Sequence, residues 1–337
     1  MEDADGGWQQ QGPKLVSTDA VGAPRQGWSV ALSADGNTAA LGGYLDNGRI
    51  GAAWVFARDA GVWSQQGPKL VGTGASWPEP QQGSSVALSA DGNTLLSGAP
   101  LDGRAAPGAA WVFVRTGGAW SQQGSKLAPV NTSSGSIYAG RPVALSADGR
   151  VAALGGYYDS AGVGAAWVFT RNDGAWTERT KLVGTGAIGL ANQGGASLAL
   201  DATGTLVASG STKHDTDLGT AWLFASGLDG GWSQTGGPLA ASGTTAPSEL
   251  ASSLSLNADG TLLAVGAPRD NTRHGGTWLF QRTGDTWTQW GTTLFGAGAS
   301  MPSSQGSSVA LSSDGRTLVI GGPADEDSGG SVWVFTR

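Results

Sequence analysis

Short segments in which apolar residues alternate with small ones recur along the chain. In residues 84–89, Val86 and Leu88 alternate with serine and alanine, a period that is typical of a β-strand. Gly92 follows in an Asp-Gly-Asn step, which has the chemistry of a tight hairpin turn. A second apolar segment, 94–99, comes directly after it. This stretch therefore predicts two antiparallel strands joined by a short turn.

Two further strands complete the unit. Residues 109–115 place Trp111 and Phe113 on one face of a strand and Val112 on the other, and a Gly-Gly turn then leads into residues 120–127. No segment shows the period of an amphipathic helix with caps, so we expect a nearly all-β protein. We name the four strands a, b, c and d in chain order.

This unit is repeated about every 56 residues, a period typical of propellers and solenoids. A tryptophan opens each d strand: Trp8, Trp63, Trp120, Trp176, Trp232 and Trp287. Another lies in each c strand: Trp54, Trp111, Trp167, Trp222, Trp278 and Trp333. A glycine marks each a–b turn: Gly36, Gly92, Gly149, Gly204, Gly260 and Gly315. All three features recur in the same order, so we expect six equivalent units.

The two ends of the chain favour a propeller over a solenoid. The sequence begins with a lone d strand, Trp8–Leu15, and ends on a c strand, Val332–Arg337, so the first could pair with the second and seal the ring. A solenoid would need capping units, and neither end resembles one. We predict an N-terminal tail over residues 1–7 and one six-bladed β-propeller over residues 8–337.

The repeat resembles the FG-GAP repeat of integrin α-chain propellers and their bacterial relatives. Gln82-Gly83 stands at that family's Phe-Gly, and Gly98-Ala99-Pro100 and Gly266-Ala267-Pro268 match its Gly-Ala-Pro. The resemblance implies a secreted or periplasmic protein. The chain departs from the family in having six repeats rather than the usual seven. Each a–b hairpin also keeps one aspartate, too few oxygens for the calcium site that the family often has there, so we expect no metal.

Composition narrows the class of partner. The net charge is −7 with 19 Lys and Arg, which argues against nucleic acid and anionic membranes. No apolar run approaches the length of a membrane span, and the first residues, MEDADGGW, do not read as a signal peptide. The absence of cysteine excludes disulfides, thiolate metal sites and a cysteine nucleophile. We expect a monomer without a cofactor.

The rare side chains gather on one predicted face. Strand alternation puts the short, uniform a–b and c–d turns on one side of the disc and the long, variable d–a and b–c loops on the other, where function is expected. All four tyrosines and both histidines fall on those loops, as does Lys213. The candidate ligand-binding residues are Tyr44, Trp77, Tyr138, Tyr157, Tyr158, Lys213, His214, Arg269 and His274. Trp28 can also reach this face, whereas Trp290 is expected on the rim.

Structural explanations compete for several of these residues. An aspartate recurs in every b–c loop, which indicates a carboxylate that bonds nearby amides: Asp46, Asp102, Asp159, Asp215, Asp270 and Asp325. The loop tyrosines could simply cover the mouth of the channel, and the two histidines could be incidental. No phosphate loop or nucleophile elbow is present, because the chain offers no strand–turn–helix.

Three functions fit these residues. The first is a ligand-binding propeller, carbohydrate-binding or adhesive, with one asymmetric site, because sugar faces pack on aromatic rings and hydroxyls pair with Asp, Asn and Arg. The second is an enzyme resembling a polysaccharide lyase or hydrolase. There, His214 or His274 would be the base, Tyr158 the acid, and Arg273 or Arg269 would neutralise a substrate carboxylate. The third is a structural or protein-binding scaffold.

Overall fold

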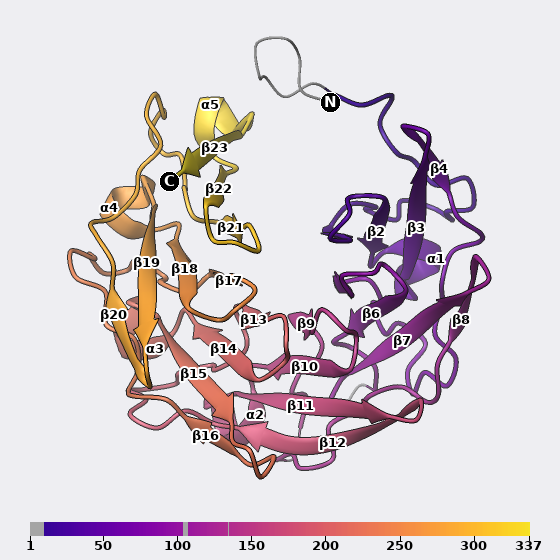
Figure 1. Ribbon diagram of the computed structural model, residues 1–337, viewed down its shortest axis with the longest axis horizontal. Coiled ribbons are helices and arrows are strands. Elements are labelled where there is room, and N and C mark those ends of the chain that lie inside the picture. Colours follow the sequence, from indigo (N-terminus) through magenta and orange to yellow (C-terminus); the bar gives the residue numbers. More distant parts are fainter. Residues whose placement is uncertain (1–9, 104–106, 134) are drawn as a thin grey trace.

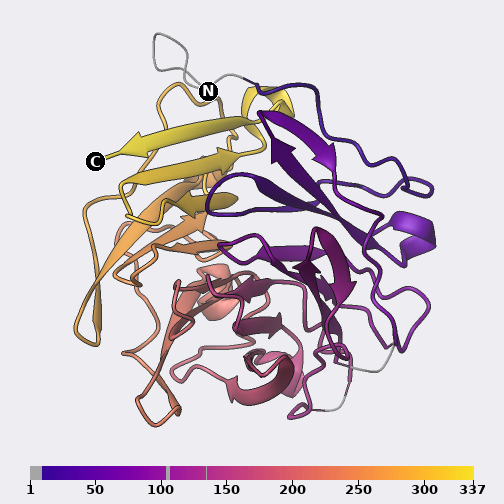
Figure 2. The same cartoon turned by 45° about the vertical axis from the view of Figure 1, so that its right-hand side comes forward.

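The computed structural model describes residues 10–103, 107–133 and 135–337 and confirms a six-bladed β-propeller. Six antiparallel sheets follow one another around a central axis in chain order, from indigo through magenta and orange to yellow (Figures 1 and 2). Strands a, such as β9, β13, β17 and β21, lie next to the axis, and strands d lie at the rim (Figure 1). Helical structure in the described part is limited to five four-residue turns in the b–c loops.

The strands have the following bounds. Blades one and two contain β1 Ser29–Leu32, β2 Thr38–Gly43, β3 Ala52–Asp59, β4 Val62–Gln65, β5 Ser85–Leu88, β6 Thr94–Ala99, β7 Ala109–Thr116 and β8 Ala119–Gln122. Blades three and four contain β9 Val143–Leu145, β10 Val151–Gly156, β11 Ala165–Asn172, β12 Ala175–Leu182, β13 Leu198–Leu200, β14 Leu206–Ser211, β15 Thr220–Ser226 and β16 Trp232–Gln234. Blades five and six contain β17 Ser253–Leu256, β18 Leu262–Ala267, β19 Gly276–Thr283, β20 Thr286–Gln289, β21 Ser308–Leu311, β22 Thr317–Gly322 and β23 Ser331–Thr336.

The five helical turns lie at equivalent places in five blades. They are α1 Asp46–Arg49, α2 Asp159–Gly162, α3 His214–Asp217, α4 Asp270–Arg273 and α5 Asp325–Ser328. Each contains residues with positive φ, such as Asn47 (φ 49°), so they are tight loops rather than true helices. Their repetition shows that one loop conformation serves blades whose loop sequences differ.

Side-chain hydrogen bonds explain why each a–b hairpin forms where it does. In blade two, the Ser89 hydroxyl donates to Asp91, and the same carboxylate accepts the backbone N–H of Asn93 at 2.9 Å. Gly92 supplies the positive φ of the turn. The strands then pair in register, with Val86 opposite Ser97. The Ser-x-Asp-Gly pattern thus supplies the side-chain hydrogen bonds and the glycine that close this turn.

Tryptophan and aliphatic side chains fill the spaces between neighbouring blades. Trp111 of β7 is almost fully buried and packs with Val86 of its own blade against Val55 and Leu70 of blade one. Its indole N–H donates to the backbone carbonyl of Thr73 at 2.8 Å, in the loop that follows blade one. The indoles of Trp167, Trp222, Trp278 and Trp333 make the same bond to a backbone carbonyl of the preceding d–a loop. In blade one the Trp54 indole donates instead to the Asp19 carboxylate of the N-terminal segment. The c-strand tryptophans of blades two to six therefore each join two blades, as expected for a blade anchor.

The d-strand tryptophans of the described residues are only partly buried. The Trp120 indole donates to the side chain of Gln66 at 2.9 Å, and Arg115 lies over its ring, 5.4 Å from the centroid. Arg115 also donates to the same Gln66 oxygen. Gln66 belongs to the preceding blade, so this cluster also joins two blades.

The last blade differs from the rest because it has three strands. Five sheets have four strands, whereas β21, β22 and β23 form the sixth alone. The pairing predicted between Trp8–Leu15 and the last blade is not found in the part of the chain that the structure covers. Trp8 lies outside that part, and residues 10–15 are not in a strand. Instead, Gln11 accepts hydrogen bonds from Arg58 and Trp63 of blade one. In Figure 1 the last blade and the first stand apart.

Candidate functional site

Three loop positions recur in each blade, and side chains at these positions line cavities at the mouth of the ring, most of them from the first four blades. One is a residue with positive φ at the end of the d–a loop: Arg25, Gln81, Tyr138, Asn192, Glu249 and Ser304. The second lies three positions later: Trp28, Ser84, Arg141, Gly195, Ser252 and Ser307. The third directly follows strand b: Tyr44, Pro100, Tyr157, Thr212, Pro268 and Pro323. The first of these positions has a positive φ in every blade, whereas the side chains at all three positions differ between blades and make the mouth asymmetric.

Aromatic rings occupy these positions on one side of the mouth only. Tyr138 stacks on Tyr157 with ring centroids 5.2 Å apart and an interplanar angle of 14°. Tyr158 lies 4.6 Å from Tyr157, tilted by 44°, and half of its surface is exposed. In blade one, Trp28 meets Tyr44 edge to face at 4.9 Å. The three-tyrosine cluster and the Trp28–Tyr44 pair come from blades three and one.

These rings line adjoining cavities. The cavity between the two groups has a volume of ≈ 500 Å³ and is lined by Trp28, Tyr44, Gln81, Ser84, Pro100, Leu101, Tyr138, Arg141, Tyr157 and Ala196. A neighbouring cavity of ≈ 390 Å³ is lined by Arg141, Tyr157, Tyr158, Asn192, Gly195, Ala196, Thr212, Lys213 and Ser252. A third, of ≈ 310 Å³, joins Trp77 and Glu79 to Tyr138. We call the surface formed by these three linings the aromatic groove.

Arg141 is a central residue of the groove that the sequence reasoning missed. Its guanidinium lies 5.6 Å from the centroid of the Tyr157 ring, and it lines both of the larger cavities. Burial raises the pKa of Tyr157, and the nearby Arg141 only partly opposes this, so the phenol remains a neutral hydrogen-bond donor. Arg141 could have been found by aligning the six repeats, because its equivalents are Trp, Ser, Gly, Ser and Ser.

The structure brings six of the predicted ligand-binding residues together in the groove: Tyr44, Trp77, Tyr138, Tyr157, Tyr158 and Lys213. His214, Arg269 and His274 are not in these linings. The Arg269 guanidinium pairs with Glu249 at 3.1 Å. His274 lies 5.6 Å from the Phe295 ring, and its Nδ1 is buried without a hydrogen-bond partner in the described structure. The predicted binding residues therefore separate into a groove and a set outside it.

In the fourth blade, His214 takes the place in the b–c loop that the sequence analysis gave to Asp215. His214 lies three residues after the end of β14, just as Asp46 lies three residues after the end of β2. The two residues are therefore equivalent, and the fourth blade has a histidine where an aspartate was expected. Its Nδ1 accepts the backbone N–H of Ile188 at 3.1 Å, as Asp46 accepts that of Val21 at 2.7 Å. Burial lowers the pKa of His214 more than Asp215 raises it, which favours the neutral, accepting imidazole.

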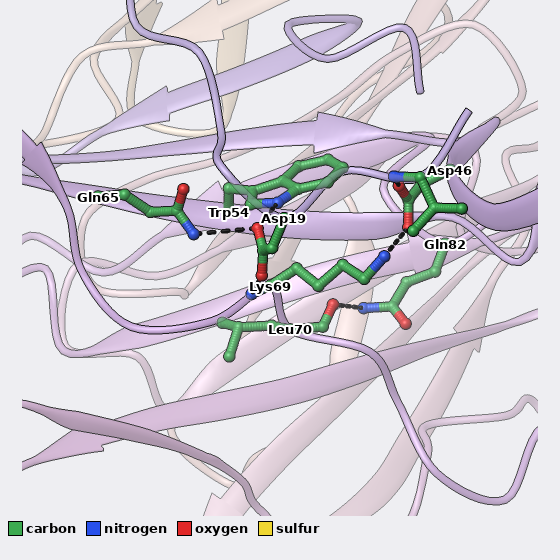
Figure 3. A network of polar contacts seen from close by, with 8 residues as sticks. Asp19, Asp46, Trp54, Gln65, Lys69, Leu70 and Gln82 are labelled. Carbon is green, nitrogen blue, oxygen red and sulfur yellow. Dashed lines mark hydrogen bonds and ion pairs between the residues drawn. The ribbon is translucent and has the colours of Figure 1, made fainter. Parts of the chain in front are cut away.

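Figure 3 shows the network that the aspartate forms in blade one. Asp46 is fully buried and accepts a hydrogen bond from the Lys69 ammonium at 2.6 Å, while the Lys69 backbone N–H donates to Asp19 at 2.6 Å. Lys126 and Lys181 pair with Asp102 and Asp159 in the next two blades. In blade four, Pro238 replaces the lysine where His214 replaces the aspartate. The recurring aspartates thus accept backbone N–H groups of the d–a loops, as predicted, in every blade except the fourth, and in three blades they also pair with a lysine.

The groups named for the enzyme hypothesis are not joined to one another. Across the described ranges, no hydrogen bond, ion pair or ring contact links His214, His274, Tyr158 and Arg273. The described residues also contain no cluster of three or more His, Cys, Asp or Glu that could hold a metal ion. Among the same residues, no helix has the length and apolar character needed to cross a membrane.

Comparison with known proteins supports the fold class and nothing narrower. The chain is a β-propeller, and it is similar to the solved structure of hydrazine synthase from Kuenenia stuttgartiensis, with a TM-score of 0.55 and 14% identity over 92% of this chain and 83% of that one. At this identity the likeness shows the fold alone. No family model and no curated protein matches the sequence, so the FG-GAP resemblance rests on the repeat residues themselves.

Proposed function

We propose that the protein binds a carbohydrate in the aromatic groove. The observation that carries the proposal is the arrangement of five rings, Trp28, Tyr44, Tyr138, Tyr157 and Tyr158, around connected cavities on one side of the mouth. Aromatic side chains combine a large apolar face with a polar edge, which suits the apolar C–H faces and hydroxyls of a sugar ring. The cavities have the size of small-ligand sites.

The charges of the lining favour acidic sugars. Arg141 lines both of the larger cavities and Lys213 lines one of them, and neither lining includes a carboxylate, although the chain carries a net charge of −7. Glu79 lines the third cavity, on the side away from Lys213. Arg141 makes no ion pair with any described residue, whereas Lys213 lies 3.2 Å from Asp217. A guanidinium can hold a carboxylate or sulfate with two parallel hydrogen bonds. We therefore expect Arg141 to favour uronic-acid or sulfated oligosaccharides over neutral ones.

The test is calorimetric titration of the full chain with galacturonic-acid oligomers, sulfated oligosaccharides and neutral oligomers. We expect Tyr157→Ala to weaken binding of every sugar by about 5-fold to 150-fold, which corresponds to the ~1–3 kcal/mol lost when an aromatic side chain that stacks on a nucleic-acid base is replaced by alanine. Arg141→Gln should weaken acidic sugars and leave neutral ones nearly unchanged. Tyr157→Phe, which keeps the ring, should retain most of the affinity.

Trp290→Ala is the matched control, because Trp290 is a partly exposed aromatic residue outside the groove that lies next to Arg337. This variant should bind as the parent does. Absence of binding to all three sugar classes would contradict the proposed function. Binding that Tyr157→Ala leaves unchanged would instead show that sugar is held elsewhere.

A further inference from the structure

Blade three departs from the repeat at its a–b turn as well as at the groove. In blades one and two, an asparagine follows the turn glycine, and its Oδ1 accepts a hydrogen bond from the Nε of an arginine near the end of strand c. These bonds join Asn37 to Arg58 and Asn93 to Arg115, both at 2.9 Å. In blade three, Arg150 stands where the asparagine is expected. A cation thus replaces an acceptor at this place.

Arg171 is the matching arginine of blade three. Its backbone N–H donates to the carbonyl of Arg150 at 2.8 Å, as that of Arg115 donates to Asn93. Its Nη1 donates to Oε1 of Gln123 at 3.2 Å, but its Nε has no acceptor among the described residues. A guanidinium carries donors only, so Arg150 cannot serve Arg171 as the asparagines serve the other two arginines.

The two guanidinium groups border one cavity. It has a volume of ≈ 530 Å³, and both Arg150 and Arg171 lie in its lining. The rest of the lining is polar or glycine: Gln123, Asn172, Asp173 and Gly174. Burial lowers the pKa of Arg171 and the charge of Arg150 lowers it further, against smaller opposite effects of Asp148 and Asp91. Arginine keeps its charge at neutral pH, so two like charges lie beside the same cavity.

Two carboxylates lie near this pair, and neither neutralises it. Oδ2 of Asp148 is 3.9 Å from Nε of Arg150, and both side chains are more than half exposed, so their attraction is weak. Asp173 lines the cavity and makes no ion pair with any described residue. Its charge opposes the binding of an anion, which makes it a useful position for a test.

Blade six carries the same two residue types in different surroundings. The backbone N–H of Arg337 donates to the carbonyl of Arg316 at 3.0 Å, as in the pair of blade three. The Arg337 guanidinium lies over the Trp290 ring, 4.9 Å from its centroid. Trp290 has the place in strand d that Gln123 has before blade three, because both donate a backbone N–H to the equivalent c strand. An indole therefore replaces the polar amide of the blade three lining.

The cavity in blade three is separate from the aromatic groove. Arg150 directly precedes β10, and Tyr157 of the groove directly follows it. At about 3.3 Å per residue the two lie roughly 20 Å apart, at opposite ends of the same strand. A ligand of this cavity therefore binds whether or not the groove holds a sugar.

We propose that Arg150 and Arg171 together bind a dianionic oxyanion, phosphate or sulfate, in this cavity. Hydrogen bonds between a guanidinium and an oxyanion are strong, and two nitrogens can donate at once. The anion gives Nε of Arg171 the acceptor that asparagine provides in blades one and two. Its two negative charges also offset the repulsion between the two guanidinium groups, so a dianion fits better than a monoanion.

The test is calorimetric titration of the full chain with sodium sulfate, at an ionic strength held constant with sodium chloride. Calorimetry is preferable to Tm because sulfate stabilises folded proteins in general. Arg150→Asn recreates the arrangement of blades one and two, and it should weaken sulfate binding by about tenfold or more because charged hydrogen bonds are lost. Arg49→Asn, the matched control, removes the same charge from an exposed residue of α1 and should bind as the parent does.

Three results would overturn the proposal. The first is equal sulfate affinity in the parent and Arg150→Asn. The second is an equal loss in Arg150→Asn and Arg49→Asn, because it would report net charge alone. The third is acetate binding as tightly as sulfate, because it would exclude selection of a dianion.

Two further variants should bind more sulfate rather than less. Asp173→Asn removes the carboxylate from the lining and should tighten binding. Asn93→Arg places a second guanidinium beside Arg115 and should add a site in blade two, where the c–d turn residues Thr116 and Gly117 carry no carboxylate. Unchanged affinity in the first variant together with no new site in the second would contradict the assigned cavity.

Inorganic phosphate and glycerol phosphate distinguish the source of the anion. Binding of both, weakened alike by Arg150→Asn, assigns the site to a phosphate ester. Binding of inorganic phosphate alone assigns it to a free anion. If neither binds and sulfate does not, the proposal is wrong.

Discussion

At the scale of single residues, the exchange of Asp for His in blade four is matched by a second exchange. Where Asp46 is paired with Lys69, the equivalents are His214 and Pro238. The neutral His214 imidazole accepts its hydrogen bond without a cation nearby. The replacement of the lysine by Pro238 is therefore consistent with the replacement of the aspartate by His214. The aspartate pattern was visible in the sequence, but its register in blade four was not, because an aspartate also stands beside the histidine. Only strand pairing shows which side chain takes the buried place.

This coupling can be measured by a double-mutant cycle. His214→Asp should destabilise the protein by about 1–3 kcal/mol, because it buries a carboxylate without a cation. Adding Pro238→Lys should recover part of the loss, with a coupling of about 0.5–3 kcal/mol. Urea unfolding at pH 7 of the parent, both single variants and the double variant gives the value. If the effect of His214→Asp is the same with Pro238 or Lys at that position, the assigned equivalence is wrong.

The hairpin carboxylates predict how stability depends on pH. The Ser33 hydroxyl and the Asn37 backbone N–H lower the pKa of Asp35 to about 2, and the hydroxyls of Thr261 and Ser312 lower the pKa of Asp259 and Asp314. A carboxyl whose pKa is lower in the folded state stabilises it above the pKa of the unfolded chain, near pH 4, and this contribution is lost as the pH falls further.

We therefore expect Tm to fall between about pH 4 and pH 2. Ser33→Ala removes the main donor to Asp35, so the variant should start from a lower Tm and lose less over the same range. Thermal unfolding followed by circular dichroism at closely spaced pH values measures both curves. Parallel curves for the parent and the variant would contradict the assigned cause.

At the scale of elements, each blade depends on its neighbour for a buried face. Trp111 is 1% exposed and lies between blades one and two. Trp111→Ala should cost about 3–5 kcal/mol through lost packing and the cavity left behind. Trp290→Ala, at a partly exposed position, should cost much less. Chemical unfolding of both variants makes the comparison, and equal losses would mean that Trp111 is not an anchor.

The strands and turns were predictable because their determinants are local. Alternation in SVALS and the Ser-x-Asp-Gly turn are contained within a few residues, and the structure places β5 and β6 at 85–88 and 94–99 accordingly. The groove was only partly predictable. Rarity drew attention to the four tyrosines, whereas Arg141 is an ordinary residue type whose importance comes from its position beside Tyr157. The short helical turns were missed because their positive-φ residues carry no helical period.

At the scale of the whole molecule, closure depends on all the junctions at once. Each junction is set by local contacts such as the Ala90–Ala147 bond, and a repeat sequence predicts those contacts well. The distance between the first and last blades is the sum of all the rotations between neighbours, so small changes at each junction open or close the ring. No single residue determines the distance between the first and last blades. For this reason the six repeated units were predictable from the sequence, whereas the gap between the first and last blades was not.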